Sequence, residues 1–240
     1  MLPPDLRHAE AEALEALIQA LISDPKGRWT VEFRFEGLRL MPVALRLAQK
    51  LMESRSDSAQ ASPGPGDVLM LFPDAGAMAL ARRDQPAMAG IISSLGDLRR
   101  RQSDGPSEGV LLLASAGPAD YEDVEALCEH HRGAVVLLNG VLEDGAVGIG
   151  SVARERRRGF LASWQSAYAL IPQSGAALKR AWPEPWRLYR QDPDGYRAVA
   201  TFEGRPDSEQ QAEALESGSG SGGFGAGLRA LDQLIEGLNH

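Results

Sequence analysis

Cysteine is almost absent from this sequence, since Cys128 is the only one in 240 residues. A single cysteine excludes a disulfide within the chain and any metal site that needs several thiolates. Cys128 lies in the helical-looking stretch 122–129, which is rich in acidic residues, and acidic neighbours raise the pKa of a thiol. We therefore predict a structural cysteine rather than a nucleophile.

Histidine is also scarce, at four residues. His130 and His131 are adjacent at the end of a predicted helix over 120–131, where a positive side chain interacts favourably with the helix dipole. Adjacent side chains point in different directions on a helix, and no His-x-x-x-His pair is present, so the pattern does not favour zinc or iron. We predict neither a metal ion nor another cofactor.

Long hydrophobic runs are missing as well. The longest apolar stretches, such as 110–114 and 134–138, have the length of a strand, whereas a membrane-spanning helix needs ~20 residues. The amino-terminus has neither the basic nor the apolar region of a secretory signal. We expect a protein without a transmembrane segment that stays in the compartment where it is made, with at most peripheral membrane association.

Positive charge is in deficit, because 25 Lys and Arg residues face 33 Asp and Glu residues and give a net charge of −8. This balance argues against a nucleic-acid partner, since nothing in the overall charge would attract phosphates. Hydrophobic residues make up 43% of the chain and charged residues 24%, which is typical of a globular protein rather than a disordered or fibrous one.

Apolar periodicity predicts alternating helices and strands over the first 140 residues. Helices are indicated over 5–22, 43–52, 75–83 and 120–131, and strands over 29–35, 68–72, 91–95, 110–114 and 134–139. Asp74 is placed to cap the third of these helices, and Pro42 fits a first helical turn. The alternation indicates right-handed crossovers and an α/β fold with a mostly parallel sheet flanked by helices.

The character of the chain changes after residue 150. An arginine-rich segment over 151–160 has a helical pattern, and strands are indicated over 164–171, 186–189 and 196–202. The turn Asp-Pro-Asp-Gly at 192–195 joins the last two strands as an antiparallel hairpin at one edge of the sheet. We read 54–66 as a surface loop. We expect one α/β domain over 1–205, then a Gly/Ser linker and an amphipathic helix within 206–240.

Two glycine motifs lack the context that their chemistry requires. Gly218–Gly225 is not followed by the Lys-Ser or Lys-Thr of a phosphate-binding loop, so we interpret it as part of a linker. Gly105-Pro106-Ser107-Glu108-Gly109 has the form Gly-x-Ser-x-Gly, but a nucleophile elbow needs a strand before the serine, and here the strand 110–114 follows it. We predict a surface turn.

Arginine clusters are the strongest functional signal. One is Arg99–Arg101, and the other consists of Arg154, Arg156, Arg157 and Arg158. Guanidinium groups bind phosphate and carboxylate in a bidentate manner, which favours an anionic ligand or an acidic partner surface. The alternative is a solvated helix face balanced by the surplus of acids. Aromatic residues gather between 164 and 196, where most would belong to the core and a few, such as Trp182, would line a partner site.

Several stretches, in this order, resemble one family. They are LFPDAG at 71–76 with ARR at 81–83, VVLLN at 135–139, the segment 154–160 leading to Tyr168, and WPEPWRLY at 182–189. Over roughly residues 5–205 they resemble a domain of unknown function of cyanobacteria and chloroplasts. That domain occurs in the plant low photosystem II accumulation proteins and as an extension of a chloroplast adenylate kinase. The sequence departs from the family at Asn139-Gly140, where relatives are expected to have Asn-Pro.

The resemblance implies a cytosolic or stromal auxiliary protein that helps to assemble photosynthetic complexes, and it supplies no catalytic residues. Our first hypothesis is therefore a non-enzymatic assembly factor whose partner is a photosynthetic complex subunit or another assembly factor. The predicted partner- or anion-binding residues are Arg154, Arg156, Arg157, Arg158, Arg82, Arg83 and Trp182.

Two other functions stay open. One is a nucleotide- or phosphometabolite-binding domain, with or without catalysis, whose ligand would sit at the turns 73–76 and 115–118. The other is a domain that only stabilises an oligomer. A concave pocket with convergent amides and an arginine at these turns would favour ligand binding, whereas a flat or filled surface would favour a protein partner.

Overall fold

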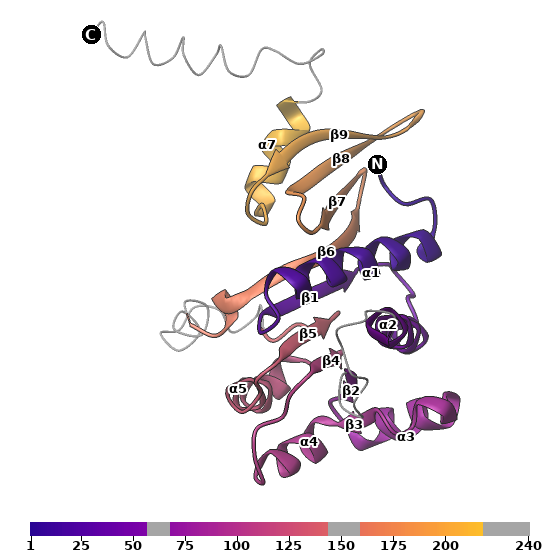
Figure 1. Cartoon of the computed structure of the whole chain (residues 1–240). Coiled ribbons are helices and arrows are strands. Elements are labelled where there is room, and N and C mark those ends of the chain that lie inside the picture. The colour runs from indigo at the N-terminus through magenta and orange to yellow at the C-terminus, as the bar shows by residue number, and fades with distance from the viewer. Residues whose placement is uncertain (57–67, 144–158, 218–240) are drawn as a thin grey trace, which may run out of the picture.

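The computed structural model describes residues 1–56, 68–143 and 159–217 (Figure 1). Several expectations fall outside these ranges: most of the loop 54–66, the arginine cluster at Arg154, Arg156, Arg157 and Arg158, the Gly/Ser segment 218–223 and the helix expected near the carboxyl terminus.

The described chain forms one mixed sheet of nine strands in the order β3-β2-β4-β5-β1-β6-β7-β8-β9. Neighbours from β3 to β6 run parallel, and those from β6 to β9 run antiparallel. This arrangement confirms the predicted fold class. The strands are β1 (Arg28–Phe33), β2 (Val68–Phe72), β3 (Ile92–Ser94), β4 (Val110–Ala114), β5 (Ala134–Leu138), β6 (Trp164–Gln173), β7 (Ala176–Ala181), β8 (Trp186–Asp192) and β9 (Gly195–Phe202).

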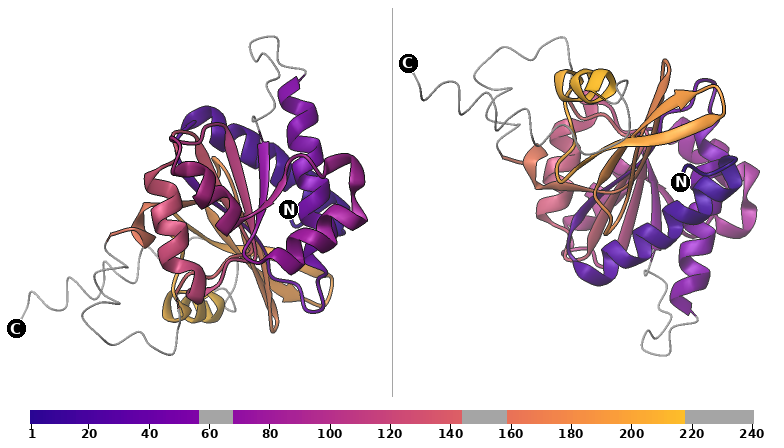
Figure 2. Two further views of the ribbon diagram at one scale, coloured as in Figure 1. Left: turned by 90° about the horizontal axis from the view of Figure 1, so that it is seen from below. Right: turned by 90° about the horizontal axis from the view of Figure 1, so that it is seen from above.

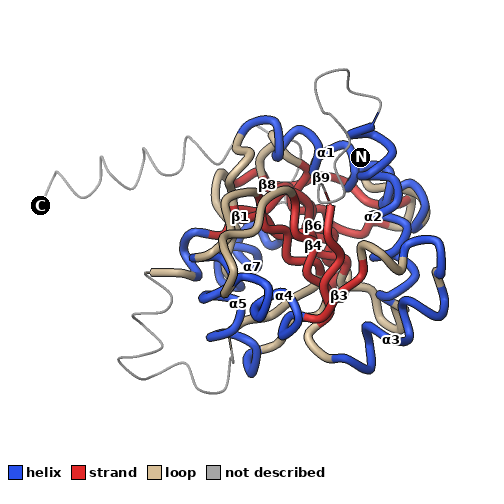
Figure 3. Tube along the Cα trace, turned by 60° about the horizontal axis from the view of Figure 1, so that its bottom comes forward, coloured by secondary structure: helices blue, strands red, loops and turns tan. Residues whose placement is uncertain are grey.

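Helices cover both faces of the parallel part of this sheet (Figures 1 and 2). The helices α1 (Leu6–Ser23), α2 (Leu40–Ser56) and α3 (Ala75–Asp84) pack on one face, and α4 (Leu95–Gln102) and α5 (Tyr121–Glu129) pack on the other. Figure 3 shows the strands gathered at the centre with helices around them. Within the described ranges, no helix is both long and apolar enough to cross a bilayer.

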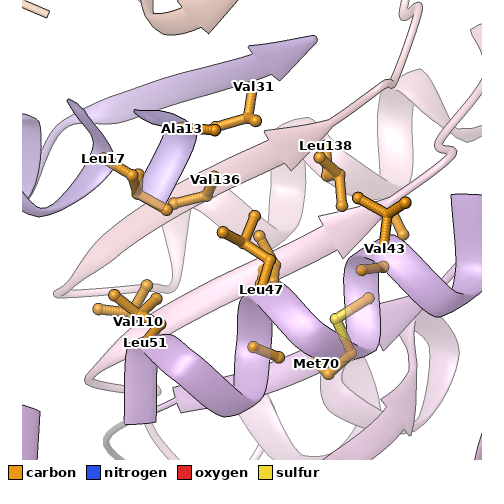
Figure 4. Close-up of a cluster of buried hydrophobic side chains, with 14 of the residues drawn as sticks. Ala13, Leu17, Val31, Val43, Leu47, Leu51, Met70, Val110, Val136 and Leu138 are labelled. Carbon is orange, nitrogen blue, oxygen red and sulfur yellow. The ribbon is translucent and has the colours of Figure 1, made fainter. Parts of the chain in front are cut away.

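The core explains why β2, β4 and β5 are apolar at every position. Met70 and Val136 face α1 and α2, whereas Leu71 and Leu111 face α4 and α5. A strand covered on both faces has no wet side, so it reads as a continuous hydrophobic run. Figure 4 shows the core between the sheet and the helices α1 and α2, in which Leu47 of α2 points toward the strands.

Local capping fixes where several helices begin. The Asp74 carboxylate accepts a hydrogen bond from the Ala77 amide at 2.8 Å, which confirms the predicted cap of α3. Asp5 caps α1 and Ser94 caps α4 in the same way. Several boundaries were wrong. Residues 54–56 continue α2 rather than opening the loop, and β1 ends at Phe33 rather than at residue 35. Leu95 begins α4, a helix that the sequence did not predict, because the Ser94 side chain caps it directly after β3.

The carboxyl-terminal part extends the sheet with three antiparallel connections, of which only the β8–β9 hairpin was predicted. A separate cluster of buried residues holds it together, including Leu178, Trp186 and Leu188. The short helix α7 (Ser208–Ser217) packs its Ala214 and Leu215 against this cluster. The end of the expected domain at 205 therefore lies just before a helix that contacts β9.

Candidate binding site at the carboxyl ends of the parallel strands

The neighbouring strands β2 and β4 connect in opposite directions. From β2 the chain passes through α3 to β3 on one side, and from β4 it passes through α5 to β5 on the other. The loops after the two strands therefore diverge to opposite faces of the sheet. In open α/β sheets, ligands bind in the crevice that such a topological switch point leaves at the strand carboxyl ends.

A pocket of about 300 Å³ occupies this switch point. Its walls come from the start of α2, the β2–α3 turn and the β4–α5 turn, so it coincides with the two turns that the sequence singled out. Most of the lining is apolar, and the polar groups are two carboxylates and a hydroxyl. The lining residues are Leu40, Met41, Phe72, Pro73, Asp74, Ala77, Ala114, Ser115, Gly117 and Asp120.

Carboxylates of the chain already occupy backbone amides that an anion would need in this pocket. Asp74 accepts from the Ala77 amide, and Asp120 Oδ2 accepts from the Gly117 amide at 2.7 Å. None of the described residues that line the pocket is basic. A phosphate would meet two negative side chains and no guanidinium or ammonium group, so the pocket disfavours phosphorylated ligands.

The neighbouring strand ends are held by two residues with positive φ angles, Ser115 at 60° and Asn139 at 51°. The Asn139 side chain accepts from the Phe33 amide at 2.6 Å and donates to the Phe33 carbonyl at 2.7 Å, so it continues the pairing of β5 with β1. Arg34 donates to the carbonyls of Asn139 and Gly140. These contacts fix the carboxyl edge beside the pocket.

An ion cluster around the buried Glu32 lies further along the same edge. Glu32 is 5% exposed and accepts from Arg34 at 3.1 Å and from Arg205 at 2.8 Å. Arg205 follows β9, and its guanidinium also lies 5.4 Å from the Trp186 ring centroid. The cluster therefore ties the antiparallel part to β1. The sequence analysis did not single out these three residues. The available signal was Glu32, an acidic side chain within a largely apolar strand. If such a strand is covered by neighbouring structure, its carboxylate needs a positively charged partner.

The predicted site residues Arg82 and Arg83 have different surroundings. The Arg82 guanidinium donates to the Ile92 carbonyl at 3.1 and 2.6 Å, so it links α3 to β3. Arg83 pairs with the adjacent Asp84, and 74% of its side chain is exposed. Both residues are exposed, but the Arg82 guanidinium is bound to the backbone, whereas that of Arg83 pairs with an exposed carboxylate.

The first arginine cluster, Arg99–Arg101, is paired within the protein. Arg99 contacts Asp123 and Arg100 contacts Asp97, both through ion pairs. Arg101 donates to the Ser93 hydroxyl at 2.8 Å. These contacts favour the interpretation of a balanced helix face over that of an anion site.

Trp182 is half-buried at the turn between β7 and β8. Its ring meets that of Trp29 edge-on, with centroids 5.1 Å apart, and the Arg180 guanidinium lies 5.3 Å from its centroid. Arg180 is 9% exposed, and burial lowers the pKa of its guanidinium. Trp182 thus exposes part of its aromatic ring at the surface, and the buried Trp29 ring packs against it.

Two predictions about isolated residues can be compared with the structure. Cys128 lies on the buried face of α5, and burial raises the pKa of its thiol to about 12, as expected of a structural cysteine. His130 caps α5 and its Nδ1 lies 2.9 Å from the Ala126 carbonyl, which confirms the capping interpretation for this residue. The interpretation was wrong for His131, which lies beyond the helix in a bridge to Ser107. Searched over the described residues, the structure contains no cluster of side chains able to hold a metal ion.

Comparison with family models matches residues 3–213 to a domain of unknown function, DUF1995. The match includes every strand of the sheet and extends into α7. No curated protein matches the chain.

Proposed function

Because the chain belongs to the DUF1995 family, we propose that it is an auxiliary factor for the assembly of photosynthetic complexes, acting by binding a protein rather than by catalysis. The photosynthetic setting rests on the motif resemblance to the low photosystem II accumulation proteins. The partner is a subunit of a photosynthetic complex or another assembly factor. The site of action is a cyanobacterial cytosol or stroma-like compartment, with at most peripheral contact with a membrane.

The observation that carries the binding role is the chemistry of the switch-point pocket. Asp74 and Asp120 take up the Ala77 and Gly117 amides, and no basic side chain lines the pocket among the described residues. This arrangement disfavours the main alternative, a nucleotide- or phosphometabolite-binding domain, because phosphate recognition needs donors and positive charge.

Trp182 and Arg83 are proposed as two separate contacts with the partner, toward opposite edges of the sheet. Large aromatic rings are enriched where proteins bind each other, Trp182 is only half-buried, and the Trp29 ring keeps it in place before contact. The exposed pair of Arg83 with Asp84 contributes only ~0–1 kcal/mol, so the Arg83 guanidinium is available to an acidic partner group. The cluster Arg154, Arg156, Arg157 and Arg158 belongs to the same proposal and lies outside the described residues.

The test is affinity capture from a cyanobacterial lysate, with mass spectrometry of bound proteins and small molecules. The wild-type chain is compared with Trp182→Ala, with Arg83→Ala and with a control, Lys50→Ala, at an exposed position on α2. We expect a photosystem subunit or assembly factor to be enriched, to be reduced by the first two substitutions and to be retained by Lys50→Ala. A stoichiometric nucleotide or phosphometabolite without such a protein would contradict the proposal.

A further inference from the structure

Another pocket lies at the opposite edge of the sheet, at the amino ends of β2 and β4. Its volume is about 450 Å³. One wall is apolar, from Val68, Leu69, Ile91, Leu98 and Leu111, and the rim is polar, with Arg101, Gln102, Ser107 and Glu108. A pocket of this size and character suits a small ligand with an apolar chain and a polar group.

Ser107, which lines this pocket, is hydrogen-bonded to the side chain of His131. Ser107 Oγ lies 2.8 Å from His131 Nδ1, and His131 Nε2 lies 3.1 Å from the Gly109 carbonyl oxygen. A carbonyl oxygen only accepts, so Nε2 carries the ring proton and Nδ1 offers its lone pair to the Ser107 hydroxyl. This is the tautomer that a general base needs in order to take the serine proton.

The backbone fixes the pair from both sides. Ser107 and His131 form a parallel bridge, in which the Ser107 amide donates to the His130 carbonyl and the Arg132 amide donates to the Ser107 carbonyl. The buried Gln102 amide group donates to Ser107 Oγ at 2.9 Å and to the Leu127 carbonyl at 3.1 Å. The geometry is therefore held by α4, α5 and the loop between α4 and β4.

Burial lowers the pKa of His131 below its ordinary value of 6.5. The imidazole is consequently neutral at physiological pH and able to accept a proton. The charged groups near it are Glu108 and Arg132, which are exposed and 4.0 Å apart.

The Gly-x-Ser-x-Gly motif is not a nucleophile elbow, since Ser107 precedes β4 as the sequence predicts. The base comes instead from a residue 24 positions later, which sequence spacing did not connect to the serine. We propose that Ser107 is a nucleophile activated by His131, and that it accepts the acyl group of esters of short apolar acids bound in the pocket. This would give the protein a chemical activity beyond the proposed partner binding, at the opposite edge of the sheet.

The step balances with water as the only co-reactant. Ser107 Oγ attacks the ester carbonyl carbon while its proton passes to His131 Nδ1. The bond from the carbonyl carbon to the alcohol oxygen then breaks, and the alcohol leaves with that proton. Water attacks the acyl-serine and gives a proton to His131, which returns it to Ser107 as the acid leaves.

The experiment follows p-nitrophenol release from p-nitrophenyl butyrate by the full chain. General-base assistance contributes ~10²–10⁴-fold, so we expect Ser107→Ala and His131→Gln to lower the rate at least ~100-fold. The wild-type rate should fall on acidification with a midpoint below 6.5, the ordinary pKa of histidine. The control Ser23→Ala removes an exposed serine at the end of α1, outside the lining of this pocket, and should keep the wild-type rate.

Circular dichroism and thermal melts establish that each variant is folded. His131→Gln provides the second variant in case Ser107→Ala does not fold, because glutamine preserves a hydrogen-bonding side chain without a basic nitrogen. Equal rates for the wild type and the folded variants, or a rate no higher than that of the heat-unfolded chain, would overturn the proposal. Either result would leave the partner-capture experiment unaffected.

Discussion

Trp186 and Trp182 stand four positions apart, and the protein buries them to different extents. Trp186 is 4% exposed among Leu178, Leu188 and neighbouring side chains, whereas Trp182 keeps part of its ring in solvent and rests on Trp29. The two rings therefore have different roles: Trp186 fills part of a core, and Trp182 leaves part of its ring exposed to solvent.

We expect Trp186→Ala to lower the free energy of unfolding by ~3–5 kcal/mol, because it empties a packed site. Trp182→Ala should cost about 1–2 kcal/mol, since an aromatic pair contributes ~0.5–1.5 kcal/mol beyond the area it buries. Urea denaturation of the two variants measures both values. A larger loss for Trp182→Ala would show that the roles are reversed and would remove the argument for Trp182 as a partner contact.

Cys128 should resist thiol reagents in the folded protein. With a thiol pKa of about 12 and a buried position, almost no thiolate is present at pH 8. We expect a disulfide reagent such as Ellman's reagent to modify Cys128 only at the rate of unfolding, and rapidly in urea. Fast modification of the native chain at pH 8 would contradict the assignment as a structural residue.

At the scale of the element, capping decides where the short helices begin. The ten-residue helix α3 starts directly after β2, and the Asp74 carboxylate satisfies its Ala77 amide. The same carboxylate lines the switch-point pocket. The Asp74 side chain thus both caps the helix and occupies the Ala77 amide, which is then not free to donate a hydrogen bond to an anionic ligand in the pocket.

Replacing this cap tests its contribution to stability. Asp74→Ala should lower the free energy of unfolding by ~0.5–2 kcal/mol, because it leaves the Ala77 amide without its partner. Asp74→Asn is the matched control, since asparagine is an equally good capping residue and should stay within a few tenths of a kcal/mol of the wild type. Equal urea midpoints for the alanine and wild-type proteins would show that the cap does not stabilise the helix.

At the scale of the whole molecule, the parallel and antiparallel parts meet at β1 and β6 and share one continuous sheet. The Glu32–Arg205 ion pair adds a second link between parts that are 173 residues apart in the sequence. Its carboxylate is buried, so water screens the interaction less than it screens a surface pair.

A double-mutant cycle measures this link. We expect Glu32→Gln with Arg205→Gln to give a coupling energy of about 1–3 kcal/mol, because hydrogen bonds to charged groups lie in that range and Glu32 is desolvated. The exposed pair Arg83–Asp84 is the control, and its cycle should give ~0–1 kcal/mol. Similar couplings for the two pairs would mean that the buried cluster does not join the two parts of the sheet.

Local sequence determined most of the elements. The strands β2, β4 and β5 were found because both of their faces are covered, and the start of α3 because Asp74 precedes it. The β8–β9 hairpin followed from its Asp-Pro-Asp-Gly turn, where Gly195 takes a φ of 129° that favours glycine. These features depend on a few neighbouring residues, so the sequence contains the information directly.

Only the tertiary structure decided which strands are neighbours, and therefore where the pockets lie. The switch point exists because β2 pairs with β4 while their helices leave in opposite directions. The Glu32–Arg205 ion pair and the Ser107–His131 hydrogen bond join residues whose separation in sequence carries no signal. Strand order and such pairs result from competition among long-range contacts over the whole chain, which apolar periodicity and turn residues do not encode.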